Sequence, residues 1–395
     1  MDSPKLRFTG FKGDWKKVKF NSLFSEVNEK TGDTKNFPLY SLTVQDGVTK
    51  KTERYNREFL VKKEDNFKIV RANYFVSNPM NMTIGALAQY KGKGDISVSG
   101  YYNVFKNISK YKNQFLEDFL KSSKMIWLYK SIATGSLIEK QRVHFSQFIE
   151  LTVKLPDYNE ANKISDFMEI LTKKVQHQQE KIYLLKEQEK GYMQNIFRQE
   201  LRFKDKHGQD FPEWDINVKA GELFEPISNK NHDGSIPVLS ATQDSGMVYR
   251  DSLERQMAFN DKNLKSYKLV EKNDFIISLR SFQGGIELSN LQGLVSPAYT
   301  VFRKKSSKVY EPYFAKIFKT DFFIQLLNST TYGIRDGKAI SYKDFSTLKF
   351  SIPSLEEQKK IAEFLSVLHK KIQIENEKLV SLQKHKQAFM QQLFI

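Results

Sequence analysis

The pattern of hydrophobic and polar positions changes character three times along the chain. Up to Leu155, short β-branched and aromatic runs are separated by Gly, Asn and Asp, which is typical of strands and turns. From 156 to 200, Gly and Pro almost vanish, and hydrophobic residues recur in steps of four and three. Both patterns then return. The sequence predicts two globular domains, 1–155 and 201–352, followed by long helices at 156–200 and 353–395.

The second half of the chain repeats the first at an offset of about 197 residues. Leu6-Arg7-Phe8 returns as Leu201-Arg202-Phe203, and Leu155-Pro156 returns as Ile352-Pro353. Within the globular parts, helical interludes are predicted at 115–129 and 311–327. The fold class is therefore α+β, with two repeated mixed α/β domains, a pair of long helices and pseudo-twofold symmetry between the halves.

Each predicted long helix carries ten seam layers at an average spacing of 3.5 residues, eight of them hydrophobic, which is the pattern of a coiled-coil seam. Both helices carry polar residues in the same two layers, Gln178 with Glu375 and Glu189 with Lys386. Polar seam residues commonly fix register at some cost in stability. The main seam residues are Ile164, Leu171, Ile182 and Leu185 in the first helix and Leu365, Ile372, Leu379 and Leu382 in the second.

Charge is unevenly distributed. The 395 residues include 63 Lys and Arg against 46 Asp and Glu, a net charge of +17. Residues 1–155 carry +12 of this and residues 201–352 carry +4, whereas the two helices are nearly neutral. The globular segments therefore favour a polyanionic partner.

Composition excludes several protein classes. A hydrophobic content of 39% with 13% aromatics is too high for a disordered chain. The absence of Cys excludes disulfides, Cys-zinc sites and thiol nucleophiles. The first residues lack the apolar core of a signal peptide, and no apolar run has the length of a membrane span. We expect a cytoplasmic protein with no membrane contact.

No catalytic constellation is found in the sequence. The six His residues are scattered without metal-ligand spacing, so no metal site is predicted. Gly337-Lys338-Ala339 lacks the rest of a phosphate-binding loop. Phe282-Gln283-Gly284-Gly285 lacks the spacing of a methyl-donor loop, and Ser77-Asn78-Pro79-Met80 lacks the second Pro and the aromatic residue of an amino-methyltransferase loop.

Basic turns next to aromatic strands are the better candidates for function. Gly allows close approach of the backbone to a phosphate, and Arg and Gln can read base edges with two hydrogen bonds. These turns occur at equivalent places in both repeats, which favours contact with DNA. The candidate DNA-contacting residues are Ser77, Asn78, Lys91, Lys93, Gly135, Lys140 and Arg142 in the first repeat and Arg280, Ser281, Gln283, Arg335 and Lys338 in the second.

Over essentially its whole length, the chain resembles the specificity subunits of type I restriction–modification systems. The resemblance rests on Pro4-Lys5-Leu6-Arg7-Phe8 with Trp15, on residues 333–345, and on 352–362, which contain Pro353-Ser354-Leu355-Glu356-Glu357-Gln358. The first half departs from the family pattern, because residues 155–162 lack the Glu-Gln pair.

The resemblance implies two target recognition domains, each recognising one half of a split, asymmetric DNA site. It implies that the long helices pack antiparallel as a coiled-coil spacer and bind two modification subunits, and that two motor-nuclease restriction subunits join for cleavage. This chain would bind no cofactor. S-adenosylmethionine, ATP and Mg²⁺ would be bound by the partners, and the chain alone would be non-catalytic.

Other functions stay open on the residues alone. A stand-alone tandem DNA-binding regulator would need a recognition-helix motif or dimer symmetry, and the sequence shows no helix-turn-helix signal. A coiled-coil scaffold that binds only proteins would leave the +12 of residues 1–155 unexplained. A stand-alone nuclease or methyltransferase would show activity as a purified chain.

Overall fold

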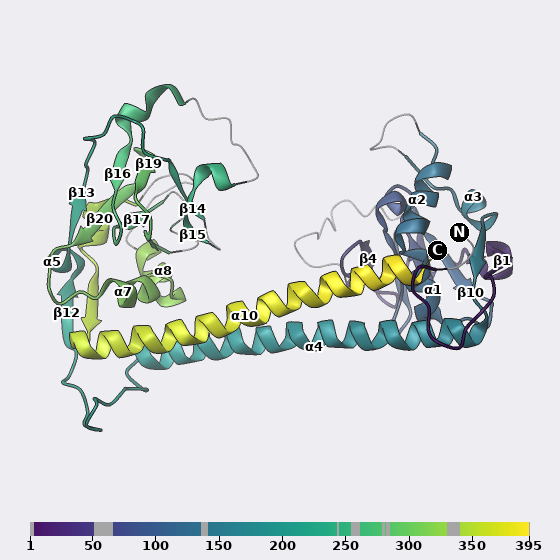
Figure 1. The fold of residues 1–395 in the computed structure, drawn as a ribbon, viewed down its shortest axis with the longest axis horizontal. Coiled ribbons are helices and arrows are strands. Elements are labelled where there is room, and N and C mark those ends of the chain that lie inside the picture. The colour runs from purple at the N-terminus through teal and green to yellow at the C-terminus, as the bar shows by residue number, and fades with distance from the viewer. Residues whose placement is uncertain are drawn as a thin grey trace. The chain divides into compact units, whose positions relative to one another are not determined.

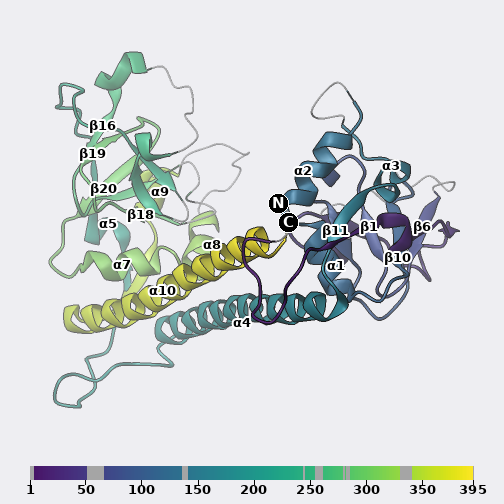
Figure 2. The same cartoon turned by 45° about the vertical axis from the view of Figure 1, so that its right-hand side comes forward.

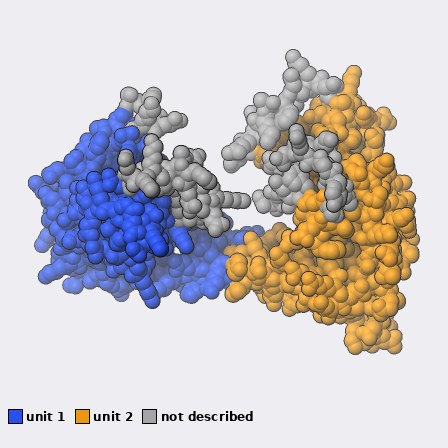
Figure 3. Space-filling view, turned by 180° about the vertical axis from the view of Figure 1, so that it is seen from behind, with its two compact units in different colours: residues 1–181, 375–395 blue, residues 182–374 orange. Residues whose placement is uncertain are grey.

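The computed structural model describes residues 4–50, 66–135, 141–242, 245–253, 261–278, 281, 285–329 and 340–394, and for 261–263 and 329 it describes only the backbone. The chain forms two compact units, which Figure 3 shows in different colours. Unit 1 comprises residues 1–181 and 375–395, and unit 2 comprises residues 182–374. Each unit therefore contains one globular domain together with parts of both long helices.

The two long helices, α4 (Tyr158–Phe197) and α10 (Leu355–Leu393), lie where the sequence predicts them (Figure 1). With 40 and 39 residues, each is about 60 Å long at 1.5 Å per residue. In unit 1 the rings of Phe167 and Phe389 lie 5.0 Å apart, and in unit 2 those of Tyr192 and Phe364 lie 5.1 Å apart. Residue numbers rise along α4 as they fall along α10, so the helices are antiparallel.

The predicted seam positions form the covered stripe of each helix. All ten on each helix are buried or half-buried, whereas most of the residues between successive seam positions are exposed. In the first helix, Ile164 and Ile182 are buried and Leu171 and Leu185 are half-buried. In the second helix, Leu365 and Ile372 are buried and Leu379 and Leu382 are half-buried.

The globular part of unit 1 consists of small antiparallel sheets and short helices. A four-stranded sheet has the order β2-β10-β7-β8, a three-stranded sheet has the order β3-β6-β9, and β1-β11 and β4-β5 form pairs. The strands are β1 (Lys16–Lys19), β2 (Phe24–Val27), β3 (Lys30–Thr31), β4 (Tyr40–Thr43), β5 (Gly47–Lys50), β6 (Phe67–Val70), β7 (Phe75–Ser77), β8 (Leu87–Gln89), β9 (Ile96–Val98), β10 (Asn103–Asn107) and β11 (Thr152–Leu155). The helices are η1 (Phe20–Ser22), η4 (Met82–Ile84), α1 (Asn113–Leu120), α2 (Ser123–Ile132) and α3 (Phe145–Ile149).

Unit 2 repeats this order of elements. Its four-stranded sheet is β13-β20-β17-β18, and β12-β21, β14-β15 and β16-β19 form pairs. The strands are β12 (Asp215–Lys219), β13 (Phe224–Ile227), β14 (Leu239–Thr242), β15 (Gly246–Tyr249), β16 (Lys268–Val270), β17 (Phe275–Ile277), β18 (Glu287–Leu288), β19 (Gly293–Val295), β20 (Thr300–Lys304) and β21 (Lys349–Ile352). The helices are α5 (Ala220–Leu223), η6 (Arg250–Ser252), η7 (Asp261–Ser266), α7 (Glu311–Ile317), α8 (Asp321–Ser329) and α9 (Tyr342–Ser346).

Equivalent aromatic rings in the cores of the two units pack at nearly the same distances and angles. The rings of Phe75 and Phe105 stack at 5.4 Å with an interplanar angle of 11°, and their equivalents Phe275 and Phe302 stack at 5.2 Å and 12°. Phe24 and Phe224 each pack edge-on against these stacked rings. Such offset and edge-on pairs are the preferred arrangements of aromatic rings. The sequence repeat is therefore a structural repeat.

Each predicted helical interlude is in fact two helices. The segment 115–129 breaks after Leu120 because the Ser122 side chain caps α2 by accepting a hydrogen bond from the Met125 amide. In the second repeat the Thr320 hydroxyl accepts from the Phe323 amide in the same way, which separates α7 from α8. Local capping thus overrides an uninterrupted helical pattern.

Each globular core is completed by the last turns of the long helix that ends there. Leu393 and Phe394, at the end of α10, belong to the core of unit 1, and Ile196 of α4 belongs to that of unit 2. The Leu6 amide donates to the Gln392 carbonyl at 3.0 Å, so the N-terminal segment lies against the end of α10 (Figure 2). Among the described residues, we find no helix with the length and hydrophobicity needed to span a membrane.

Candidate nucleic-acid interface

One surface of unit 1 combines basic and aromatic side chains without acidic residues. It is formed by η4, α2 and residues 141–149, which include Lys124, Lys130 and Arg142 but neither Asp nor Glu. Helix η4 packs on α2, and two large apolar side chains are exposed there, Ile84 at 60% and Trp127 at 62%. We call this the α2 surface. Its charge and aromatic content suit a polyanion with stacked bases.

Three candidates from the sequence lie together at one edge of the α2 surface. Backbone hydrogen bonds of 2.9 Å in both directions pair Thr134 with Arg142, which places Gly135 and Arg142 at the base of one loop. The Val143 amide donates to the Pro79 carbonyl at 3.0 Å, so the turn that begins at Asn78 adjoins this loop. Gly135 is exposed and has φ +128°, a backbone conformation that favours glycine.

Arg142 is the exposed cation of this edge. Its guanidinium carbon lies 5.4 Å from the ring centroid of the exposed Tyr101, within the range of a cation–π contact. On α2, Lys124 Nζ lies 5.9 Å from the Trp127 ring. Both cations are therefore supported by an aromatic face while remaining accessible to a partner.

Two further candidates have buried side chains. Ser77 lies in β7 and is 1% exposed. Ser281 is also 1% exposed, and its hydroxyl accepts a hydrogen bond from the Ser278 amide at 2.9 Å. In this structure neither hydroxyl is accessible to a duplex, so we leave both out of the interface.

The glycine-rich turn that carries Lys91 and Lys93 has a packing role. A Cβ at Gly92 would overlap the Tyr90 hydroxyl, which donates to the Gly94 carbonyl at 2.8 Å. The Lys91 ammonium lies 2.8 Å from Glu117 of α1, which neutralises its charge. Lys93 is exposed. This turn therefore needs glycine for its own folding, whether or not a phosphate approaches it.

The remaining candidates, Lys140, Arg280, Gln283, Arg335 and Lys338, lie outside the described residues. In unit 2 the described equivalent of the α2 surface is α8, where Phe322 is 71% exposed. Sequence reasoning missed Trp127, Ile84 and Phe322. A signal was available, because Trp127 falls between Met125 and Tyr129, which form the buried stripe of α2.

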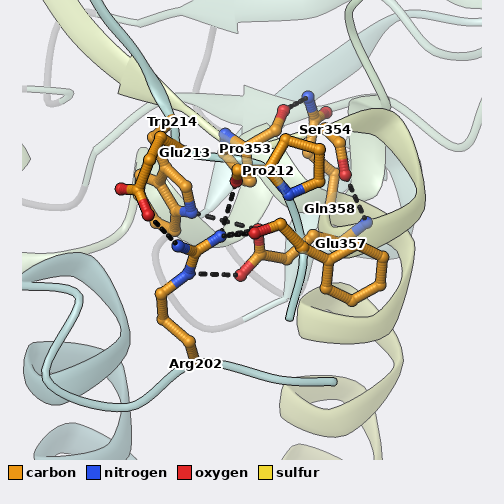
Figure 4. Close-up of polar contacts among 9 residues, drawn as sticks. Arg202, Pro212, Glu213, Trp214, Pro353, Ser354, Glu357 and Gln358 are labelled. Carbon is orange, nitrogen blue, oxygen red and sulfur yellow. Dashed lines mark hydrogen bonds and ion pairs between the residues drawn. The ribbon is translucent and has the colours of Figure 1, made fainter. Parts of the chain in front are cut away.

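A buried ion pair joins the long helix α10 to its globular domain (Figure 4). Glu357 in the first turns of α10 is 0% exposed. Arg202 donates to both of its oxygens, from Nε at 3.3 Å and from Nη2 at 3.0 Å, and Trp214 Nε1 donates to Oε2 at 3.1 Å. The hydrogen bond to Glu357 raises the pKa of Arg202. The residues that suggested the family therefore hold the helix in place.

Gln358 completes this junction. Its amide nitrogen donates to the carbonyls of Lys308 and Pro353, at 2.8 and 3.0 Å, and its Oε1 accepts from the Tyr310 amide at 2.9 Å. Ser354 Oγ accepts from the Glu357 amide at 3.3 Å and so caps the helix. A single glutamine thus joins α10 to the loop before α7.

Unit 1 contains the equivalent ion pair, although its sequence lacks the Glu-Gln pair and the Trp15 indole makes no hydrogen bond to the carboxylate. Glu160, at the position equivalent to Glu357, is 1% exposed and accepts from Arg7 Nε at 2.6 Å and Nη2 at 2.8 Å. The phenol of Tyr111 donates to the Pro156 carbonyl at 2.7 Å, the bond that Gln358 makes to Pro353. Burial raises the pKa of Tyr111 to about 12. Tyr111 therefore replaces one of the three hydrogen bonds that Gln358 makes in unit 2.

No metal centre is found in the parts of the chain that the structure describes, because nowhere in them do three or more His, Asp or Glu side chains converge in a way that could hold an ion. The buried carboxylates Glu160 and Glu357 pair with arginines that join the long helices to the domains. The α2 surface therefore remains the best candidate for a functional contact.

Comparisons of both the sequence and the structure with known proteins find type I restriction–modification specificity proteins. The family model described as "Type I restriction modification DNA specificity domain" matches residues 214–384. A Methanocaldococcus jannaschii protein, provisionally named the specificity subunit of type I restriction enzyme MjaX, is 23% identical over 326 residues, which cover 78% of this chain and 73% of the relative.

Solved structures show the same fold. The S subunit of a type I restriction-modification system from M. genitalium matches with a TM-score of 0.56 at 15% identity, over 100% of this chain and 99% of the other. A chain from a structure on complex assembly and conformational transition of the type I R-M system matches with a TM-score of 0.56 at 16% identity, over 96% and 97% of the two chains. With its α+β repeats and antiparallel helices, this chain is similar over most of its length to type I restriction–modification specificity subunits, and residues 214–384 match the DNA specificity domain of that family.

Proposed function

We propose that the two globular domains each recognise one half of a split, asymmetric DNA site, with the helix pair as the spacer between the half-sites. The observation that carries this proposal is a repeated core with different surfaces. Lys124 and Trp127 of α2 correspond to Phe322 and Gln325 of α8, and all four are exposed. Two copies of one scaffold with different exposed residues would recognise different sequences.

A domain exchange tests this proposal. Residues 16–155, from β1 to β11, are replaced by the first domain of another family member, so that Arg7, Glu160 and both helices are kept. We expect a genome-wide adenine methylation map to change in one half-site only, because each domain has its own core. Alteration of both half-sites would contradict independent recognition by the two domains.

Partner binding on the helices is supported by duplicated apolar positions. Two identical modification subunits would require two equivalent sites on one chain. Large apolar residues are exposed at three pairs of positions separated by 197 residues, and these pairs are Tyr158 with Leu355, Ile170 with Val367, and Tyr183 with Val380. We propose that these residues contact two modification subunits.

The chemistry of the complex would then lie on its partners. We propose that S-adenosylmethionine is bound by the modification subunits and that ATP and Mg²⁺ are bound by two motor-nuclease subunits, with this chain non-catalytic on its own. The proposed place of action is the cytoplasm, where the partner DNA lies. The role of this chain would be to select the sequence and position the two enzymes.

Replacing Arg142 tests the α2 surface. If Arg142 contacts a phosphate, Arg142→Ala should reduce the slope of log affinity against log salt concentration by about one. If it contacts a base edge, the change should cost about 1–3 kcal/mol and relax one position of the site. Fluorescence anisotropy with duplex DNA at several salt concentrations distinguishes the two.

The matched control is Arg71→Ala, which removes a guanidinium already bound to Glu29 at 2.6 Å and near Asp95 at 3.8 Å. We expect this variant to bind DNA as the native chain does. Equal binding by the Arg142 variant, with folding intact, would remove this edge of the α2 surface from the interface.

A further inference from the structure

The two long helices meet at positions that are equivalent in the repeat. Gln178 of α4 and Glu375 of α10 are 197 residues apart, which is the repeat offset. The Gln178 side-chain amide donates to Glu375 Oε2 and to the Glu375 carbonyl, both at 2.8 Å. Glu375 is 5% exposed. At this point each helix therefore faces its own counterpart.

The residues around this contact are the same in both helices, whereas the two residues that form it differ. Lys181 and Lys378, which are also repeat equivalents, lie 3.0 and 3.1 Å from Glu375 Oε1. Hydrogen bonds from Gln178 and both lysines lower the pKa of Glu375 to about 2. If α10 faced a second α10, two carboxylates would meet here. Only the pairing of α4 with α10 places an amide opposite a carboxylate.

The second pair of polar seam positions differs in charge. In unit 1, Lys386 of α10 interacts electrostatically with Asp118 and Glu117 of α1. Burial raises the pKa of Asp118 to about 6 and lowers that of Lys386, and the attraction between the two groups opposes both shifts. Asp118 is buried, so this charge pair lies at the junction of the seam with the globular domain.

In unit 2 the signs are reversed. Glu189 of α4, the equivalent of Lys386, raises the pKa of Lys316 of α7 through its negative charge, against the lowering by burial, and Lys316 is the equivalent of Asp118. If α4 took the place of α10 at the first domain, the Glu189 carboxylate would approach Asp118 and Glu117. If α10 took the place of α4 at the second domain, the Lys386 ammonium would approach Lys316. Like charges in partly buried positions destabilise such a contact.

The apolar layers cannot make this distinction, because they are nearly the same in both helices. Met193 and Phe197 of α4 correspond to Met390 and Phe394 of α10, and Ile164 corresponds to Ile361. Replacing buried polar pairs by hydrophobic residues often stabilises a protein, so a role for these pairs in stability alone is poorly supported. A role in the choice of helix partner fits their placement.

We infer that Gln178–Glu375, Lys386–Asp118 and Glu189–Lys316 make α4 pair with α10 and disfavour pairing of either helix with its own copy from a second chain. Each folded subunit then carries one copy of each globular domain. The inference concerns folding and assembly, so it is testable without DNA or partner subunits.

The decisive variant exchanges the two seam charges, Glu189→Lys with Lys386→Glu. In the native pairing each new charge meets a like charge, whereas in a helix-exchanged dimer each meets an opposite charge. We expect light scattering to give twice the native mass of 46.2 kDa. The control, Glu187→Lys with Lys384→Glu, exchanges charges at exposed equivalent positions and should remain at 46.2 kDa.

A native mass for the seam variant, with the Tm of the control, would overturn the inference. If the seam variant gives no soluble protein, a second comparison decides. Glu189→Lys alone should lower Tm by a few degrees, and adding Lys316→Glu should restore it because the pair is rebuilt with reversed signs. Failure of Lys316→Glu to restore Tm would equally overturn the inference.

Discussion

Arg202→Ala is expected to lower the free energy of unfolding of unit 2 by about 3–5 kcal/mol, because it leaves the carboxylate of Glu357 buried without its cation. The Glu357 side chain is 0% exposed, so water cannot replace the guanidinium without opening the junction between α10 and the domain. Trp214 would remain as a single donor to Oε2. Arg202→Lys should recover only part of the loss, since one ammonium cannot reproduce the two parallel bonds.

Urea unfolding with hydrogen exchange resolved for residues 201–227 and 340–374 measures this effect. The matched control is Lys190→Ala, which removes an ion pair to Asp321 in the same unit in which both side chains are more than half exposed. We expect no measurable change from the control. A loss of stability in Arg202→Ala no larger than in the control would show that the junction does not depend on the buried pair.

If the helix pair is the spacer proposed above, lengthening both helices by one heptad is expected to widen the gap between the two proposed half-sites while leaving the sequence of each unchanged. Seven residues are inserted after Glu180 and after Glu377, which are equivalent exposed positions, so that the antiparallel layers stay matched. The helix pair then grows by about 10 Å at 1.5 Å per residue. At 3.4 Å per base pair this corresponds to about three base pairs.

Rotation limits this gain, because each added base pair turns the second half-site by about 34°. A smaller increase in the gap, with reduced activity, is therefore compatible with the proposal. The control inserts the heptad in α4 alone. The added layers of α4 then have no counterpart in α10, and we expect loss of methylation. An active doubly lengthened subunit whose methylation map keeps the native gap would show that the helices do not set the spacing.

The repeat and the helix pair were predictable from the sequence because they depend on regular spacing. Ile164 and Ile361 recur in the same steps as the other seam residues, and such periodicity survives exchange of one hydrophobic residue for another. The recurrence of Phe75 and Phe105 as Phe275 and Phe302 is also visible in the sequence, whereas the stacking of their rings is seen only in the structure.

The candidate interface was predictable only in part. Asn78, Gly135 and Arg142 lie together at one edge of the α2 surface, but Ser77 and Ser281 are buried and Lys91 is paired with Glu117. Burial and pairing depend on residues that are distant in sequence, so turn composition could not reveal them.

The junction of unit 1 shows the same limit. In unit 2 the hydrogen bond to the Pro353 carbonyl comes from Gln358, which directly follows Glu357. In unit 1 the equivalent bond to Pro156 comes from Tyr111, which lies 45 residues away, and not from the residue after Glu160. A motif defined by neighbours in sequence cannot reveal a substitute that folding brings in from elsewhere.

The position of Leu393 and Phe394 in the core of unit 1 has a consequence for biosynthesis. Domains generally fold as units in the order in which the ribosome releases them. Here the first domain is synthesised early, but the two side chains that complete its core emerge only after the whole second domain and α10. Until then its hydrophobic surface stays incompletely covered. A chain truncated before Leu393 should therefore be a substrate for chaperones and proteases through its first domain, far in sequence from the truncation.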